Sequence, residues 1–252
     1  MLNFKNIPII FDENPIARAY INLLLTNNLL DNEIIYLNSN IFLPNKMKAF
    51  LNFHKKNFYP LKLLKKKEIN DLLIQIENFF NLEKNFIKKM YDFDNIYKFK
   101  SISFINDHSI NSNSLIEKIK THSEEIFLIS GKQILRKILN INKKFIHIHP
   151  AYLPEIRGAD GSLHSISKYG NLGSTAFFVN EGIDMGEIIF REKYKYKKFK
   201  LENLGNFNLK DLYRIWFSFV DPLIRIKNLE KLINHKYDNK TVNLENNNEE
   251  NK

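Results

Sequence analysis

The chain of 252 residues is long enough for one large domain, and its hydrophobic content of 44% supports a buried core. It has no cysteine, which excludes disulfides, thiolate nucleophiles and cysteine metal sites. No apolar run approaches the roughly 20 residues of a membrane-spanning helix. Residues 1–11 lack signal-peptide features, so we expect a cytoplasmic protein without membrane contact. The net charge of +10 suits anionic partners, although a biased composition rich in Lys, Asn and Ile explains it equally well.

The first forty residues predict the opening of a parallel α/β sheet. Residues 7–11 and 34–37 form short apolar strands, and Pro15 suits the first position of a helix that reaches about Thr26. All eight glycines lie at or after Gly131, so no Gly-x-Gly-x-x-Gly turn follows the first strand. The pattern therefore favours the layered fold without a standard dinucleotide-binding turn.

Residues 45–98 predict a helical insertion or lid, because the segment is longer than a simple crossover between strands needs. Apolar side chains recur in it at helical spacing, at Leu72, Leu73, Ile76, Phe79 and Phe80. The three lysines at 65–67 precede this helix and favour a solvated helix end, with a phosphate contact as the alternative.

The centre of the sheet is expected at 99–130, with strands at 99–105 and 125–130 and a helix at 113–121. A second helix is predicted at 132–139.

A strand at 144–148 follows, and two further strands are predicted at 174–179 and 187–196. In the last strand lysines alternate with Tyr194 and Tyr196, which indicates a half-exposed edge strand. A stripe that stacks on nucleic acid is the alternative. The sequence therefore predicts an α/β fold with a mostly parallel sheet and helices on both faces.

The C-terminal part divides into a helical appendage at 201–237 and a tail at 238–252. Asn208 can cap the first helix, and Asp221-Pro222 suits the start of the second. Asn, Glu and Lys dominate the tail, which we expect to be disordered.

Two histidines at the C-terminal end of the buried strand at 144–148 predict a functional site. Side chains alternate across a strand, so His147 and His149 project from one face at its C-terminal end. Ligands bind at that end in open parallel sheets. Asp184 lies between Gly182 and Gly186 in a later loop, so we expect one site built from two separated loops.

The region carries a set of short motifs in a fixed order: Ser130–Leu135, His149-Pro150, Leu153-Pro154, Arg157-Gly158-Ala159, Gly173 before a strand, and Gly182–Ile189. In this order and at this spacing, the motifs resemble the folate-dependent formyltransferases. The family includes methionyl-tRNA, glycinamide ribonucleotide and amino-sugar formyltransferases. The resemblance is strong over 125–191, weak over the first forty residues and absent elsewhere.

The resemblance implies a Rossmann-like catalytic domain over 1–200 that transfers a formyl group from 10-formyltetrahydrofolate to a primary amine. His149 would hydrogen-bond the developing oxyanion, and Asp184 would orient His149 or accept a proton through water. His147 stands where the family has Asn and would donate a second hydrogen bond. Because an unperturbed histidine has a pKa near 6.5, we expect His147 to change its charge within the working pH range.

By the same resemblance, the folate ring would lie between the turn at 131–135 and the loop at 179–184. The expected contacts to the cofactor are Gly131, Gln133, Ile134, Leu135, Val179, Asn180, Glu181 and Gly182. We expect acceptor contacts from Arg157, Gly158 and His164, although Arg157 can instead fix its own loop. No metal is expected.

The acceptor is predicted to be a small, phosphate-bearing amine, with an amino-sugar nucleotide first and a purine intermediate next. Methionyl-tRNA formyltransferases add a C-terminal barrel that helps to hold tRNA, whereas the residues after Leu201 suit helices and a tail. We therefore do not expect nucleic acid as a partner. A homodimer is left open.

Two other functions stay open at this point. The chain can be a catalytically impaired folate- or nucleotide-binding module of the same fold, since His147 replaces the family Asn. It can also be a metal-dependent amidohydrolase in which His147 and His149 are zinc ligands and Asp184 adds a third.

Overall fold

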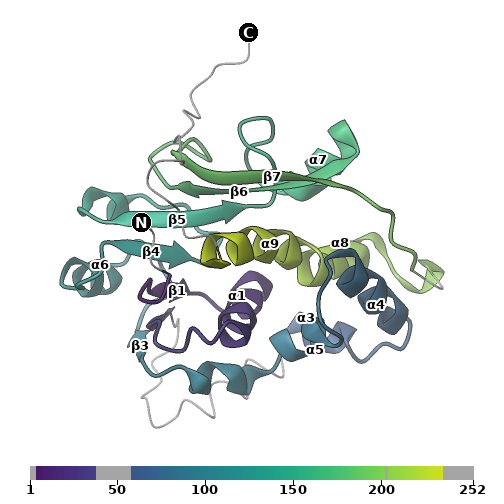
Figure 1. Ribbon diagram of the computed structural model, residues 1–252, viewed down its shortest axis with the longest axis horizontal. Helices are drawn as coiled ribbons and strands as arrows, with labels where there is room; N and C mark the ends of the chain where they lie inside the picture. Colours follow the sequence, from purple (N-terminus) through teal and green to yellow (C-terminus); the bar gives the residue numbers. More distant parts are fainter. Residues whose placement is uncertain (1–3, 38–57, 202–203, 235–252) are drawn as a thin grey trace.

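The computed structural model describes residues 4–37, 58–201 and 204–234, which form a layered α/β structure (Figure 1). The described residues build one seven-stranded sheet in the order β3-β2-β1-β4-β5-β6-β7. The first five strands in that order pair in parallel, and β6 and β7 pair antiparallel. The strands are β1 (Ile9–Phe11), β2 (Ile34–Leu37), β3 (Ile102–Ile105), β4 (Ile126–Ile129), β5 (Lys144–His149), β6 (Asn171–Phe178) and β7 (Ile188–Lys195).

Helices cover both faces of this sheet, as predicted. Ile9 and Ile34 pack toward α1 (Pro15–Thr26) and α9 (Asp221–Asn234), whereas Ile10 and Ile35 pack toward α6 (Asn113–Lys120) on the other face. This division follows from the alternation of side chains along each strand, which are apolar on both faces because both are covered. The remaining helices are α3 (Tyr59–Leu63), α4 (Ile69–Phe79), α5 (Phe86–Met90), η2 (Phe93–Lys98), η3 (Lys137–Asn140), α7 (Gly161–Tyr169), η4 (Leu204–Asn206) and α8 (Leu209–Phe219).

The link between β1 and α1 is held by its own polar side chains. Asn14 caps α1 by accepting the Ala17 N–H at 3.0 Å, and its side-chain amide donates to the Ser130 carbonyl at 3.0 Å. Arg18 is fully buried and pairs with Glu13 at 2.6 Å. These contacts join the first βα turn to the end of β4, so the turn is ordered without glycine.

The described part of the predicted insertion is helical and packs into the main core. Leu73 and Ile76 of α4 and Ile87 of α5 are buried in the same cluster as α1. Residues 45–57 of the insertion lie outside the described residues. Helix α4 therefore has the predicted apolar face, and the division into domains stays a prediction.

The C-terminal helices also belong to this core. Helix α9 packs against α1, β5 and β6, and the Asn228 side chain donates to the Ser174 carbonyl of β6 at 3.3 Å. The predicted tail at 238–252 lies outside the described residues. None of the helices in the described ranges is long and apolar enough to cross a membrane.

The helix predicted at 132–139 is wrong, because residues 132–136 are irregular and only the short η3 follows them. Its backbone is hydrogen-bonded to a distant side chain instead of to its own preceding turn. Asn111 accepts the Arg136 N–H at 2.7 Å and donates to the Ile134 carbonyl at 2.9 Å. The predicted strands are all present, with ends shifted by up to three residues, and β7 lies at an edge of the sheet as predicted.

The close packing of Gly186, in the loop between β6 and β7, can be tested by its effect on stability. A Cβ atom added at Gly186 would lie 1.6 Å from the Phe178 carbonyl oxygen, so the Gly186→Ala backbone must move. We expect Gly186→Ala to lower the free energy of unfolding by about 3 kcal/mol, at the upper end of typical overpacking costs. A Cβ atom at Gly205 meets nothing within 4 Å, which makes Gly205→Ala the matched control. Equal urea midpoints for the two variants would contradict the close approach.

Candidate active site

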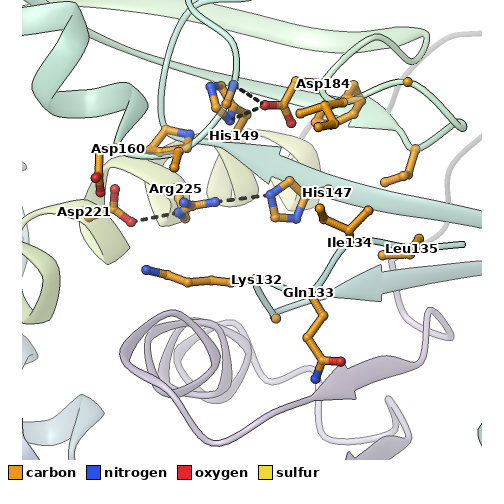
Figure 2. Close-up of a pocket in the computed structure, with 18 of the residues that line it drawn as sticks. Lys132, Gln133, Ile134, Leu135, His147, His149, Asp160, Asp184, Asp221 and Arg225 are labelled. Carbon is orange, nitrogen blue, oxygen red and sulfur yellow. Dashed lines mark hydrogen bonds and ion pairs between the residues drawn. The ribbon is translucent and has the colours of Figure 1, made fainter. Parts of the chain in front are cut away.

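A pocket of about 500 Å³ opens at the carboxyl ends of β4 and β5 (Figure 2). Its wall combines the turn after β4, the end of β5, the loop before α7 and the loop between β6 and β7, and α8 and α9 close it. A cleft outside the carboxyl ends of parallel strands is the expected ligand site in an open α/β sheet. The predicted assembly of one site from separated loops is therefore present.

His149 lies at the end of β5 and is 3% exposed. Its Nε2 atom is 3.1 Å from the Ile156 carbonyl oxygen, and its Nδ1 atom is 3.4 Å from Asp184 Oδ2. The ring fits because residue 161 is glycine, since a Cβ atom there would lie 2.8 Å from Nε2. His147 and His149 both line the pocket, which confirms their predicted common face.

Asp184 is fixed by two contacts in the loop between β6 and β7. Its Oδ2 atom accepts the Gly158 N–H at 2.7 Å and faces His149. The backbone of Asp184 has φ of 53°, a left-handed conformation that aspartate tolerates better than most residues. The carboxylate thus joins the loop before α7 to the histidine of β5.

Burial dominates the electrostatics of the His149–Asp184 pair. Desolvation lowers the pKa of His149, while the Asp184 charge and the hydrogen bond to the Ile156 carbonyl act in the opposite direction. The His149 imidazole is therefore neutral at neutral pH, and the Asp184 carboxylate would stabilise its protonated form. This arrangement can accept a proton from a bound group.

His147 contacts a residue that the sequence did not single out. Its Nε2 atom is 3.4 Å from Nη1 of Arg225 on α9, and its ring meets the Phe177 ring edge-on. Burial lowers the pKa of His147 well below its usual value of 6.5, and the positive charge of Arg225 lowers it further. The expected charge change within the working pH range is therefore wrong, and His147 is neutral there.

The predicted cofactor residues all line the pocket. These are Gly131, Gln133, Ile134, Leu135, Val179, Asn180, Glu181 and Gly182. Ile134 and Ile183 are 55% and 60% exposed and add apolar surface to the wall. The Gln133 side chain instead supports the turn, because it donates to the His108 carbonyl at 2.6 Å and accepts the Ile110 N–H at 3.1 Å.

The predicted acceptor contacts separate into two groups. Gly158 lines the pocket, whereas Arg157 and His164 are exposed and lie outside its wall. The assigned roles of all these residues stay predictions.

The C-terminal helices contribute to the pocket, which was not predicted from the sequence. The pocket wall includes four residues spaced by four positions, at Tyr213, Phe217, Asp221 and Arg225. Tyr213 and Phe217 share one face of α8, and Asp221 and Arg225 share one face of α9, because side chains four residues apart on a helix are neighbours. This spacing was visible in the sequence, but it could not show that Arg225 meets the end of β5.

Helix α8 adds an aromatic pair to this wall, and Lys132 from the turn after β4 lies against it. The Tyr213 and Phe217 rings stack with an interplanar angle of 8°, and Lys132 Nζ lies 3.1 Å from the centroid of Phe217. Tyr213 donates to Asp160 at 2.8 Å, and the Asp160 carboxylate raises the pKa of Tyr213 to about 12. Desolvation lowers the pKa of Lys132.

Within the described ranges, no group of three or more His, Cys, Asp or Glu side chains is arranged to hold a metal ion. Nε2 of His147 faces the positively charged guanidinium of Arg225, which disfavours a metal ion at that nitrogen. The alternative of a zinc site therefore gains no support from the geometry.

Comparison with known proteins shows which family the segment around this site is similar to. Residues 112–200 match the model of the formyl transferase family. A methionyl-tRNA formyltransferase of Endomicrobium trichonymphae is 32% identical over 111 residues, which are 42% of this chain and 35% of that protein. The match thus spans about a third of the length of this curated relative.

Solved structures that match this chain include two formyltransferases of low sequence identity. The phosphoribosylglycinamide formyltransferase of Streptococcus pneumoniae is 13% identical, with 90% of this chain and 97% of that chain covered and a TM-score of 0.49. A sugar N-formyltransferase of a Shewanella species is 17% identical, with 88% and 70% covered and a TM-score of 0.42.

The resemblance noted in the sequence is thus confirmed over the segment that carries both histidines and the aspartate. Residues 112–200, which include His147, His149 and Asp184, are similar to the formyl transferase family.

Proposed function

We propose that this protein transfers a formyl group from 10-formyltetrahydrofolate to the primary amine of a small molecule. The observation that carries the proposal is the buried His149–Asp184 pair, which lies beside His147 in a pocket within the family-matched segment. A neutral imidazole backed by a carboxylate suits a reaction in which an attacking amine must lose a proton.

The pocket suits a folate in size and lining. About 500 Å³ is within the range of pockets that enclose drug-sized ligands, and such pockets are mostly apolar with a few polar groups. Ile134, Leu135 and Val179 would supply apolar contact, and the backbone at 131–135 and 179–182 would supply hydrogen bonds. When bound, 10-formyltetrahydrofolate supplies the formyl group with its electrophilic carbon.

The two histidines would divide the chemical work. Formyl transfer would join the acceptor nitrogen to the formyl carbon and break the bond from that carbon to the folate nitrogen, which would leave with a proton. The acceptor nitrogen must lose one proton in the same reaction. His149 would take this proton, and Asp184 would stabilise the resulting imidazolium. Neutral His147 would donate a hydrogen bond to the oxygen on which negative charge develops, a form of stabilisation that is effective in a desolvated site.

The wall formed by α8 and α9 favours an amino-sugar nucleotide as the acceptor. The stacked Tyr213 and Phe217 rings offer an apolar face for a base or a sugar ring, and Lys132 offers a positive charge for a phosphate. Asp160 in the same pocket would attract a protonated amine before it reacts. A phosphorylated purine intermediate is the second candidate, and we do not expect nucleic acid as the acceptor.

The intact geometry of the His149–Asp184 pair favours an active enzyme over an impaired binding module of the same fold. In the proposed mechanism the residue that departs from the family, His147, keeps the ability to donate a hydrogen bond. The substitution therefore changes the donor without removing it.

The central test is the rate of formyl transfer after substitution of the pair. We expect His149→Gln and Asp184→Asn each to lose at least about a thousand-fold in kcat, and the double variant to be little worse, because the two groups act as a unit. The matched controls are His108→Gln and Asp31→Asn, whose side chains are 76% and 66% exposed and lie outside the pocket wall. Full activity in either single variant would contradict the proposed catalytic role of the His149–Asp184 pair.

The pH dependence of the rate tests the buried state of both histidines. Burial holds their pKa values below 6.5, so both stay neutral and kcat should be flat between about pH 6 and 8. The rate should fall only at lower pH, where His149 gains a proton and can no longer act as a base. His147→Asn should leave the acid limb in place. An acid limb with a midpoint near 6.5 that disappears in His147→Asn would contradict this account.

A third experiment addresses the acceptor. Lys132→Met should raise KM for a phosphate-bearing acceptor by about tenfold or more and change kcat little, since a hydrogen bond to a charged group contributes roughly 1.5–3 kcal/mol. Lys168→Met is the control, because Lys168 is exposed at the end of α7, outside the pocket wall. An unchanged KM in Lys132→Met would show that Lys132 does not bind the acceptor.

A further inference from the structure

Arg225 of α9 reaches under the end of β5 and touches the histidine that departs from the family. Its side chain is buried, with the whole residue 6% exposed. The Nη1 atom lies 3.4 Å from His147 Nε2 and also donates to the Ile148 carbonyl. Figure 2 shows the resulting row of Asp221, Arg225 and His147 along one side of the pocket.

Asp221 fixes the guanidinium from behind. Its Oδ2 atom accepts the Arg225 Nε–H at 3.0 Å, and its Oδ1 atom accepts the Ser162 hydroxyl of α7 at 3.1 Å. Both oxygens of the carboxylate are therefore occupied, and its two partners lie on different helices. A buried ion pair with satisfied hydrogen bonds holds its members in one orientation.

The chemistry of a guanidinium restricts the state of the ring that it faces. Arginine has five N–H donors and no acceptor, so the nitrogen that faces it must present a lone pair. In a neutral imidazole one nitrogen carries the proton and the other accepts. With Nε2 as the acceptor, the proton of His147 resides on Nδ1.

The other groups around His147 agree with this assignment. The titratable and charged groups that face it in the described part of the chain are Arg225, with Asp221 behind it, and His149 on the same strand. Protonated His147 would place an N–H against the N–H of Arg225 and two positive charges side by side. The neutral ring with Nδ1–H is the state in which neither conflict occurs.

We propose that Arg225 is a positioning residue that holds His147 as the Nδ1–H tautomer, so that Nδ1–H is the ring's hydrogen-bond donor for the reaction. An asparagine amide always has N–H donors, whereas a histidine donates from a given nitrogen only when its tautomer is set. The contact from α9 therefore makes histidine a defined donor at a position that the family fills with asparagine. This inference rests on the proposed function.

The tautomer can be measured without any assay of activity. In protein labelled with ¹⁵N in its imidazoles, long-range ¹H–¹⁵N correlation spectra distinguish the two tautomers, and His147→Asn assigns the signals. We expect the wild-type ring as Nδ1–H and the Arg225→Met ring as a mixture or as Nε2–H. Arg225→Lys, which keeps a charged donor, should restore much of the Nδ1–H population. Arg214→Met on α8 is the control and should leave the signals unchanged.

A double-mutant cycle separates tautomer control from structural support. Arg225→Met should lower kcat, when His147 is present, by the factor by which the Nδ1–H population falls, and by at most about a hundred-fold, the typical cost of one oxyanion donor. The same substitution should have little effect on kcat in the His147→Asn background, because asparagine needs no tautomer control. Arg225→Lys provides the comparison if Arg225→Met does not fold, with the expected loss between wild type and the Met variant.

Two results would overturn the inference. One is a wild-type His147 that is Nε2–H or protonated at neutral pH. The other is an equal loss of kcat from the Arg225 substitution in both backgrounds, which would make Arg225 a structural tie between α9 and β5. A protein that shows the expected tautomer but transfers no formyl group would instead count against the proposed function alone.

Discussion

The contact between Asp184 and His149 is the interaction on which the rest of the site depends. One carboxylate oxygen accepts the Gly158 N–H and faces the imidazole at 3.4 Å, so a single atom joins the loop before α7, the loop after β6 and the end of β5. Burial favours the neutral histidine, and the carboxylate favours the protonated one. These opposed tendencies keep the pair able to take up a proton and to release it.

The C-terminal helices complete this site from the other side. Helix α9 packs on α1, β5 and β6, and it brings Arg225 against His147 and the Ile148 carbonyl. Helix α8 adds the stacked Tyr213 and Phe217. The segment after residue 200 therefore supplies part of the pocket wall in addition to core packing, and the pocket depends on how α8 and α9 meet the sheet.

The part of the site that could be predicted from the sequence is local. Alternation along β5 places His147 and His149 on one face, and the spacing of the motifs predicts that the Asp184 loop meets them. The contributions of Asp221 and Arg225 were not predicted, since the direction in which a helix faces the sheet is set by tertiary packing. Their spacing of four residues with Tyr213 and Phe217 was the available signal.

Two expectations failed for the same kind of reason. The helix expected at 132–139 is absent because Asn111, from another segment, hydrogen-bonds the Arg136 N–H and the Ile134 carbonyl. The charge change expected for His147 is absent because burial and Arg225 favour the neutral ring. In both cases a residue distant in sequence decides the outcome, and local pattern does not contain that information.

The most direct measurement is the mass of the product after purified protein is incubated with 10-formyltetrahydrofolate and a panel of amines. The panel should include amino-sugar nucleotides, phosphorylated purine intermediates and the same sugars without phosphate. The account predicts an acceptor that gains one formyl group in the presence of wild-type protein and stays unchanged with His149→Gln. Formylation at the same rate with His149→Gln would contradict the central role of the His149–Asp184 pair.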